Sequence, residues 1–250
     1  MNKVVIVGSS IQPREGKFTY SETRSKFDSE ERFRQTIFTI NSLRNCLPDA
    51  RIIIIDSSND YKEYIPNLSF IKNVEYVPLK ELSYSAFESV NTHYNKSYCE
   101  NLLLNTLYTK FKKELLGYDY IIKATGRYFY YDFNDNLFNE QNLDKIFFKK
   151  PLKFVWNDAW NYWMIDRRQI QQDNFLRQYC TVLYGFGSQH LEKMIDINEA
   201  SMKFMDSPEM KHYDIETLSY YLTRPYEDKV LETDWKVSGW DGVSGRYMYY

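Results

Sequence analysis

The sequence has few cysteines, and none of them is placed in a paired pattern. Its 250 residues include only Cys46, Cys99 and Cys180. An odd number of widely separated cysteines argues against a disulfide framework. We therefore expect reduced, partly buried thiols and a reducing compartment.

The chain also lacks a basic excess and a long apolar run. It carries 32 Lys and Arg against 34 Asp and Glu, for a net charge of −2. A protein that coats nucleic acid usually has a basic excess, so we expect no nucleic-acid partner. The opening segment Met1–Gly8 is too short for a signal peptide, and no segment approaches the ~20 apolar residues of a membrane span. We expect a soluble cytoplasmic protein, in the host cytoplasm if its source is a virus.

Several common catalytic patterns are missing as well. The first glycine, Gly8, is followed by Ser-Ser, so neither G-x-G-x-x-G nor the P-loop pattern is present. The hydrolase pattern G-x-S-x-G does not occur either. His93, His190 and His212 lie far apart without metal-ligand spacing. A dinucleotide fold, a P-loop and a nucleophile elbow are therefore not indicated.

Aromatic residues are abundant, at 18% of the chain with 23 Tyr and 16 Phe. Sugar-binding clefts favour aromatic rings, because the apolar C–H faces of sugars stack on them. An A/T-rich genome produces the same bias. The aromatic content by itself leaves both explanations open.

Apolar runs and helical periodicity predict one α/β domain with a mostly parallel, Rossmann-like sheet flanked by helices. The first helix begins at Ser29, taken as its cap, and the last segment, with three glycines among polar residues, predicts a flexible tail. Short connections imply parallel strand pairs. The expected strands are Val4–Val7, Arg51–Ile55, Val74–Pro78, Tyr118–Lys123, Lys153–Trp156 and Tyr179–Tyr184, and the later helices are Ser97–Leu116 and Ile215–Leu222.

Polar residues follow three of these strands. In parallel sheets, ligands bind at the carboxyl ends of the strands. Ser9 follows the first strand, Asp56 and Ser57 follow the second, and Thr125-Gly126-Arg127 follow the fourth. Asp56 could accept a hydrogen bond from a base or ribose, or could cap the local turn; the two readings have equal weight.

Four ordered segments resemble a known enzyme family. They are Glu31-Arg32…Gln35-Thr36, Lys96-Ser97-x-x-Glu100, Lys123-x-Thr-Gly-Arg-Tyr128, and Ser238-Gly239…Ser244-Gly245. Their order resembles GT-A type glycosyltransferases, in particular small transferases that build surface glycans in bacteria and large algal viruses, including chlorovirus capsid glycans. The resemblance implies a GT-A-like fold and a nucleotide-sugar donor, expected to be a UDP-sugar. It also implies an oligosaccharide or glycan acceptor.

The chain departs from that family at the expected metal motif. A typical GT-A enzyme has Asp-x-Asp after the fourth strand, where carboxylates hold a divalent metal against the donor diphosphate. Here that place holds Lys123-Ala-Thr-Gly-Arg127. Lys123 and Arg127 can stabilise the leaving diphosphate, and Gly126 lets backbone approach it closely. We expect no required cofactor, although the segment Asp132–Asp135 keeps a divalent metal such as Mn²⁺ or Mg²⁺ open. The alternative is that both cations are solvated surface charges.

Further donor contacts are expected from scattered cations. Arg24, Arg32 and Lys96 are candidates for the phosphates, the last at a helix start where the dipole favours an anion. Ser244 and Arg246 could close over the donor as a lid. Surface charge and a disordered terminus are the respective alternatives.

An inverting transfer also requires a base near the acceptor hydroxyl. Asp214 and Glu216 begin a late helix, the context in which the base of inverting GT-A enzymes commonly occurs; a cap and a first-turn acid are the alternatives. Asp158 is a third candidate. The residues expected to contact the acceptor are Trp156, Trp160 and His212.

These observations predict one glycosyltransferase domain over residues 1–250, with a nucleotide-sugar half at 1–130, an acceptor half at 131–236 and a flexible tail or lid at 237–250. The expected reaction is inverting and metal-independent. A non-catalytic nucleotide- or carbohydrate-binding module is the alternative. A sugar nucleotidyltransferase ranks lower, because Gly8-Ser-Ser-Ile-Gln-Pro lacks the glycine- and basic-rich loop of that class.

Overall fold

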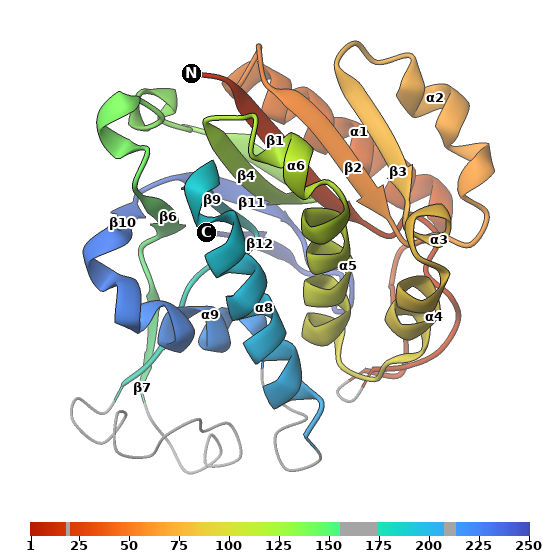
Figure 1. Ribbon diagram of the computed structural model, residues 1–250. Coiled ribbons are helices and arrows are strands. Elements are labelled where there is room, and N and C mark those ends of the chain that lie inside the picture. The colour runs from red at the N-terminus through yellow and green to blue at the C-terminus, as the bar shows by residue number, and fades with distance from the viewer. Residues whose placement is uncertain (19–20, 156–174, 208–213) are drawn as a thin grey trace.

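The computed structural model describes residues 1–18, 21–155, 175–207 and 214–250, and a seven-stranded sheet forms its centre (Figure 1). Within this sheet β9 runs antiparallel to both of its neighbours, and the other pairs are parallel. The strand order is β10 (Val230–Thr233), β6 (Ile146–Lys149), β9 (Leu183–Gly187), β4 (Tyr120–Thr125), β1 (Lys3–Ser9), β2 (Arg51–Asp56) and β3 (Val74–Pro78).

The central strands are apolar on both faces because both faces of the sheet are covered. Val4 to Val7 and Ile52 to Ile55 are fully buried. The parallel registers place Ser9 beside Asp56 and Gly8 beside Thr125. The carboxyl ends of β1, β2 and β4 therefore meet at one edge of the sheet.

Helices cover the two faces unequally (Figure 1). One face packs against α4, α5, α8 and α9, and the other packs against α1 and a small three-stranded sheet. In the described ranges no helix is both long and apolar enough to cross a membrane. The helices are α1 (Ser29–Cys46), α2 (Ile65–Ser69), α3 (Leu79–Leu82), α4 (Tyr84–Thr92), α5 (Lys96–Lys110), α6 (Lys112–Leu115), α8 (Leu191–Met205) and α9 (Ile215–Thr223).

The interpretation of residues 237–250 as a flexible tail was wrong. β11 (Lys236–Trp240) pairs antiparallel with both β5 (Tyr128–Tyr131) and β12 (Tyr247–Tyr249). Val237 is fully buried against the main core, which anchors this sheet. A further pair, β7 (Leu152–Val155) with β8 (Phe175–Gln178), forms a separate two-stranded sheet.

Most of the helices and strands predicted for the first half of the chain match the structure. The wrong predictions have local causes. The predicted helix cap at Ser29 was wrong: Asp28 is the N-cap, and its carboxylate accepts a hydrogen bond from the Glu31 N–H at 2.8 Å. The predicted strand Tyr179–Tyr184 was also wrong, since a turn separates β8 from β9. Apolar and β-branched composition cannot distinguish a buried turn from a strand over so short a stretch.

Candidate functional site

A pocket opens at the sheet edge where β1 and β4 end. Eight of the twelve donor-site residues expected from the sequence line it, and four do not. The eight are Ser9, Arg24, Arg32, Ser57, Lys96, Thr125, Gly126 and Arg127, and the others are Asp56, Lys123, Ser244 and Arg246.

The turn after β4 fixes Arg127 in the pocket wall. The Gly126 N–H donates to the Gly8 carbonyl at 3.0 Å, which closes the turn against β1. Arg127 has φ 87°, in the left-handed region that non-glycine residues rarely occupy. Its N–H donates to Thr39 Oγ1 at 2.9 Å, and its carbonyl accepts from the Trp240 N–H at 3.3 Å. Strained backbone held by such bonds is typical of functional sites.

Arg32 enters the same pocket from α1. It is only 5% exposed, and its Nη1 donates to Ser25 Oγ at 2.9 Å. Burial, together with the positive charge of Arg127, lowers the pKa of Arg32 well below its ordinary value. The Nε atoms of Arg32 and Arg127 are both buried without a hydrogen-bond partner among the described residues. Two neighbouring guanidinium groups with unused donors form a site suited to an anion.

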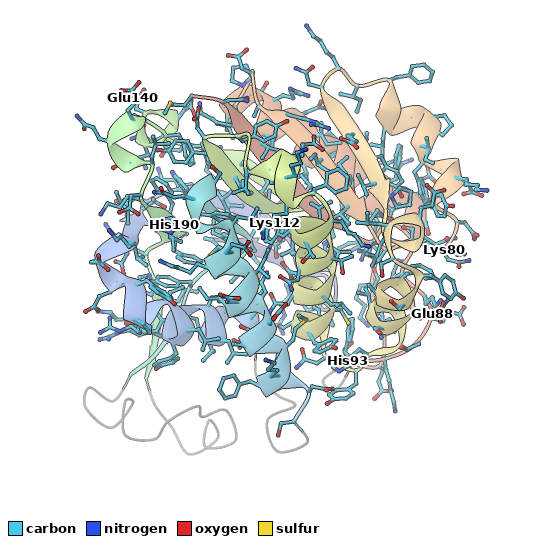
Figure 2. All side chains as sticks on the ribbon, in the orientation of Figure 1. Lys80, Glu88, His93, Lys112, Glu140 and His190 are labelled. Atoms are coloured by element: carbon cyan, nitrogen blue, oxygen red, sulfur yellow. The ribbon has the colours of Figure 1, made fainter. Side chains whose placement is uncertain are left out.

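The other two cations of the pocket differ in their surroundings. Arg24 donates to the carbonyls of Val90 at 2.9 Å and His93 at 2.5 Å, and its guanidinium lies 4.6 Å from the centre of the Phe18 ring. Figure 2 shows His93 where α4 ends and α5 begins. Arg24 therefore joins the wall to the end of α4. Lys96 is the first residue of α5, where the helix dipole also favours an anion.

Lys123 lies beneath the pocket instead of lining it. Its side chain is fully buried and forms an ion pair with Glu100. Nζ also donates to Thr125 Oγ1 at 2.7 Å and to the Thr181 carbonyl at 2.5 Å. Burial opposes ionisation of Glu100, but the Lys123 ammonium outweighs it and lowers the pKa of Glu100. The structure thus places Lys123 as the buried partner of a carboxylate that does line the pocket.

Asp56 caps local backbone groups. It is fully buried and accepts from the N–H groups of Ile11 at 3.0 Å and Ser58 at 2.8 Å. These contacts match the capping alternative that the sequence left open. Its neighbour Ser57 lines the pocket.

The loop between β11 and β12 completes the wall through residues that the sequence did not single out. Gly242 and Val243 line the pocket, whereas Ser244 and Arg246 are exposed outside it. A Cβ at Gly242 would lie 2.5 Å from Nη1 of Arg127, so glycine is needed for this close approach.

Two further lining residues, Cys99 and Glu100, could have been found from helical spacing. They share one face of α5 with Lys96 and Leu103, which also line the pocket. Asn91, from α4, gave no comparable signal in the sequence.

The acids that begin α9 differ in what they contact. Asp214 is the N-cap: its carboxylate accepts from the Thr217 N–H at 2.7 Å and from Gln178 Nε2 at 2.9 Å. Glu216 accepts a hydrogen bond from Thr181 Oγ1 at 3.0 Å. Burial, followed by the charges of Asp214 and Glu100, raises the pKa of Glu216 to about 7. A carboxyl group with such a pKa is suited to exchange a proton near neutral pH.

Four of the expected residues lie outside the described ranges: Asp158, Trp156, Trp160 and His212. The described ranges also contain no group of three His, Cys, Asp or Glu side chains that could hold a metal ion. Glu100 is the one carboxylate among the lining residues, and it is paired with Lys123. These residues therefore do not fit the metal that a typical enzyme of this fold class holds.

No protein-family profile and no curated protein matches the chain. Among solved structures, mouse xyloside xylosyltransferase 1 in its apo form is similar, with a TM-score of 0.52 and 9% identity over 92% of this chain and 85% of the other. GlyE of Streptococcus pneumoniae TIGR4 gives a TM-score of 0.49 and 8% identity over 94% of this chain and 46% of the other. The first similarity concerns the fold, and it confirms that this chain has a GT-A-like glycosyltransferase fold.

Proposed function

We propose that the protein is a glycosyltransferase that moves a sugar from a nucleotide-sugar donor, a UDP-sugar, to a saccharide acceptor in surface-glycan synthesis. The observation that carries the proposal is the pair of guanidinium groups, Arg32 and Arg127, at the carboxyl ends of β1 and β4. Both line the pocket, and each keeps a buried Nε without a partner among the described residues. A diphosphate is the anion that this position of the fold would receive.

The chemistry asked of this pair is charge stabilisation. As the bond between the anomeric carbon and the diphosphate oxygen breaks, the bonding electrons remain on the diphosphate. Guanidinium groups fixed in advance and shielded from water stabilise such a charge strongly. Arg32 is held in place by Ser25, and Arg127 by its backbone bonds to Thr39 and Trp240. We assign to these cations the role that a metal ion has in a typical enzyme of this fold.

Glu216 is the residue that we assign as base. In an inverting transfer, the acceptor hydroxyl attacks the anomeric carbon from the side opposite the diphosphate, and its proton passes to the base. The pKa of Glu216, raised to about 7 by burial, suits this exchange. Glu216 accepts a hydrogen bond from Thr181, and the Thr181 carbonyl accepts one from Lys123, the partner of the lining residue Glu100.

The test is nucleotide release from a panel of nucleotide sugars that includes UDP-xylose, with and without EDTA. Wild-type protein should release nucleotide slowly without acceptor, and EDTA should not abolish the release. Arg127→Ala should lower the rate by about 100-fold, the effect of losing one fixed charge-stabilising donor. Arg34→Ala is the matched control, because Arg34 is an exposed cation of α1 that pairs with Glu30.

Three outcomes would contradict the proposal in whole or in part. Equal nucleotide-release rates for Arg127→Ala and wild type would show that the guanidinium pair does not stabilise the leaving group. Tight nucleotide binding with no turnover, even with saccharide acceptors present, would make the protein a non-catalytic binding module. Loss of all turnover with EDTA, restored by Mn²⁺ or Mg²⁺, would instead assign the leaving-group charge to a metal.

A further inference from the structure

Five aromatic rings form a continuous row on the outer surface of the small sheet. We call Phe38, Phe129, Trp240, Tyr247 and Tyr249 the aromatic row. Successive ring centres are 5.8, 5.6, 4.9 and 5.0 Å apart, in that order. The row thus joins α1, β5, β11 and β12 through ring contacts alone.

Strand alternation explains why these rings share one face. In β5 and β11, Tyr128, Tyr130 and Val237 point into the core and are at most 5% exposed. Side chains at the alternate positions must therefore point outward. Trp240 pairs directly with Tyr247 across the β11–β12 ladder. Figure 1 shows β11 and β12 behind the main sheet, on the side away from α5 and α8.

The rings leave a large apolar surface open to solvent. Phe38 is 53% exposed, Tyr247 40% and Tyr249 76%. Large exposed aromatics cost hydrophobic free energy, and a contiguous group of them marks a binding surface. Because each ring contacts the next, the rings offer successive contact positions to a chain-like ligand.

The row is continuous with the pocket along two strands. Arg127 immediately precedes β5, which carries Phe129. The Arg127 carbonyl accepts a hydrogen bond from the Trp240 N–H. Trp240 is followed by Asp241 and Gly242, and Gly242 lines the pocket against the Arg127 guanidinium. A ligand on the row is therefore one loop away from the proposed donor site.

Polar groups accompany the rings. Ser238 Oγ lies 2.9 Å from the Tyr247 hydroxyl, beneath the row. Tyr249 adds an exposed hydroxyl, and Lys236 pairs with Asp132 at 2.5 Å beside the same strands. Apolar faces with hydroxyls at their edges match a sugar, which has apolar C–H faces and equatorial hydroxyls. Tyr, Trp and Phe are enriched in protein interfaces as well, so it is the continuity of the row with the pocket that favours a saccharide here.

We infer that the aromatic row binds an extended saccharide chain and holds the acceptor glycan on the enzyme between transfers. This inference rests on the proposed function, because it takes the glycan to be the substrate of the neighbouring pocket. The row stacks on successive sugar rings, and the free end of the glycan reaches the pocket past the β11–β12 loop.

The test measures binding of cellohexaose, xylohexaose and maltohexaose by isothermal titration calorimetry, with glucose as the short reference. At least one hexasaccharide should bind wild-type protein, and glucose should not bind measurably. Trp240→Ala and Tyr249→Ala should each weaken the binding roughly two- to tenfold, the value of one stacked ring. Tyr249 is 76% exposed, so its variant should fold even if Trp240→Ala does not. Phe70→Ala, at an 87% exposed ring that ends α2, is the matched control and should bind as wild type does.

Three results would overturn the inference: no hexasaccharide binding, equal binding by Tyr249→Ala and wild type, or a dimer in light scattering that Tyr249→Ala dissociates without a change in saccharide affinity. Nucleotide release by the same wild-type preparation tests the proposed function separately. Release without saccharide binding would refute the aromatic row alone. Ring-dependent saccharide binding without turnover of any nucleotide sugar would refute the transferase and leave the row as a carbohydrate-binding site.

Discussion

Replacing Lys123 by Met should destabilise the protein and leave the donor site chemically complete. Nζ of Lys123 is fully buried, pairs with Glu100, and donates to Thr125 and Thr181. Met fills much of the space of the aliphatic stem but removes all three interactions. Glu100 then remains as a carboxylate without its partner, and the Thr181 carbonyl loses a donor.

The expected loss follows from the cost of breaking a buried pair on one side only. Such a change costs about 3–5 kcal/mol, because it leaves a buried charge uncompensated. The Glu100 side chain is 22% exposed, so partial hydration and proton uptake relieve part of the cost. We expect a decrease of about 3 kcal/mol in the free energy of unfolding.

The assay is urea denaturation of Lys123→Met, Glu100→Gln and the double variant. A double-mutant cycle isolates the pair, and removing both charges is much less costly than removing one. The double variant should therefore be more stable than Lys123→Met alone. The reasoning would be refuted if Lys123→Met kept its stability within about 1 kcal/mol, a typical effect of a single substitution, and lost donor affinity instead. If the double variant, which lacks the Glu100 charge, lost donor affinity as well, Lys123 would be a donor ligand.

Three further predictions concern the pocket loop, the candidate base and a close backbone contact. Gly242→Ala would place a Cβ 2.5 Å from Nη1 of Arg127, so the guanidinium should shift and donor binding should weaken about tenfold in calorimetry. Little stability should be lost, because a flexible side chain yields, and unchanged affinity would contradict the position of Arg127. Burial raises the pKa of Glu216 from 4.5 to about 7, so the folded state keeps this proton longer than the unfolded state. Stability should therefore fall as pH rises between those values, transfer rate should rise through pH 7, and Glu216→Gln should abolish both trends in denaturation and rate profiles. Gly187→Ala would place Cβ 1.7 Å from the Leu143 carbonyl oxygen, and we expect a loss of about 3 kcal/mol or more in urea denaturation; near-wild-type stability would show that the backbone there can yield.

Local patterns predicted the framework of the donor half. Apolar β-branched runs identified β1 and β2, and helical spacing identified α1; the predicted helix Ser97–Leu116 covers two helices in the structure, α5 and α6. Burial of a strand and the amphipathic face of a helix are properties of neighbouring residues, so they are visible in the sequence. β6 and α8 were not anticipated, and β11 was interpreted as tail because glycines and polar residues dominate its surroundings.

The candidate site also has features that the sequence predicted and features that depend on tertiary contacts. That polar residues at the ends of β1 and β4 would meet followed from parallel strands alone, and Ser9, Gly126 and Arg127 do line one pocket. Whether each polar side chain lines the pocket or forms structural hydrogen bonds and ion pairs depends on its neighbours in space. Asp56 caps backbone groups, and Lys123 pairs with Glu100 from α5.

The sequence by itself therefore determined an α/β sheet with positively charged residues at its carboxyl edge, because short-range apolar patterns specify strands and helices. Only the tertiary structure decided which cations remain available to an anion. Lys123 points to the helical face of β4, where Glu100 neutralises it, whereas Arg127 turns outward and meets Arg32 and Gly242. These partners are distant in the sequence, and the pairing of charges depends on distance in space.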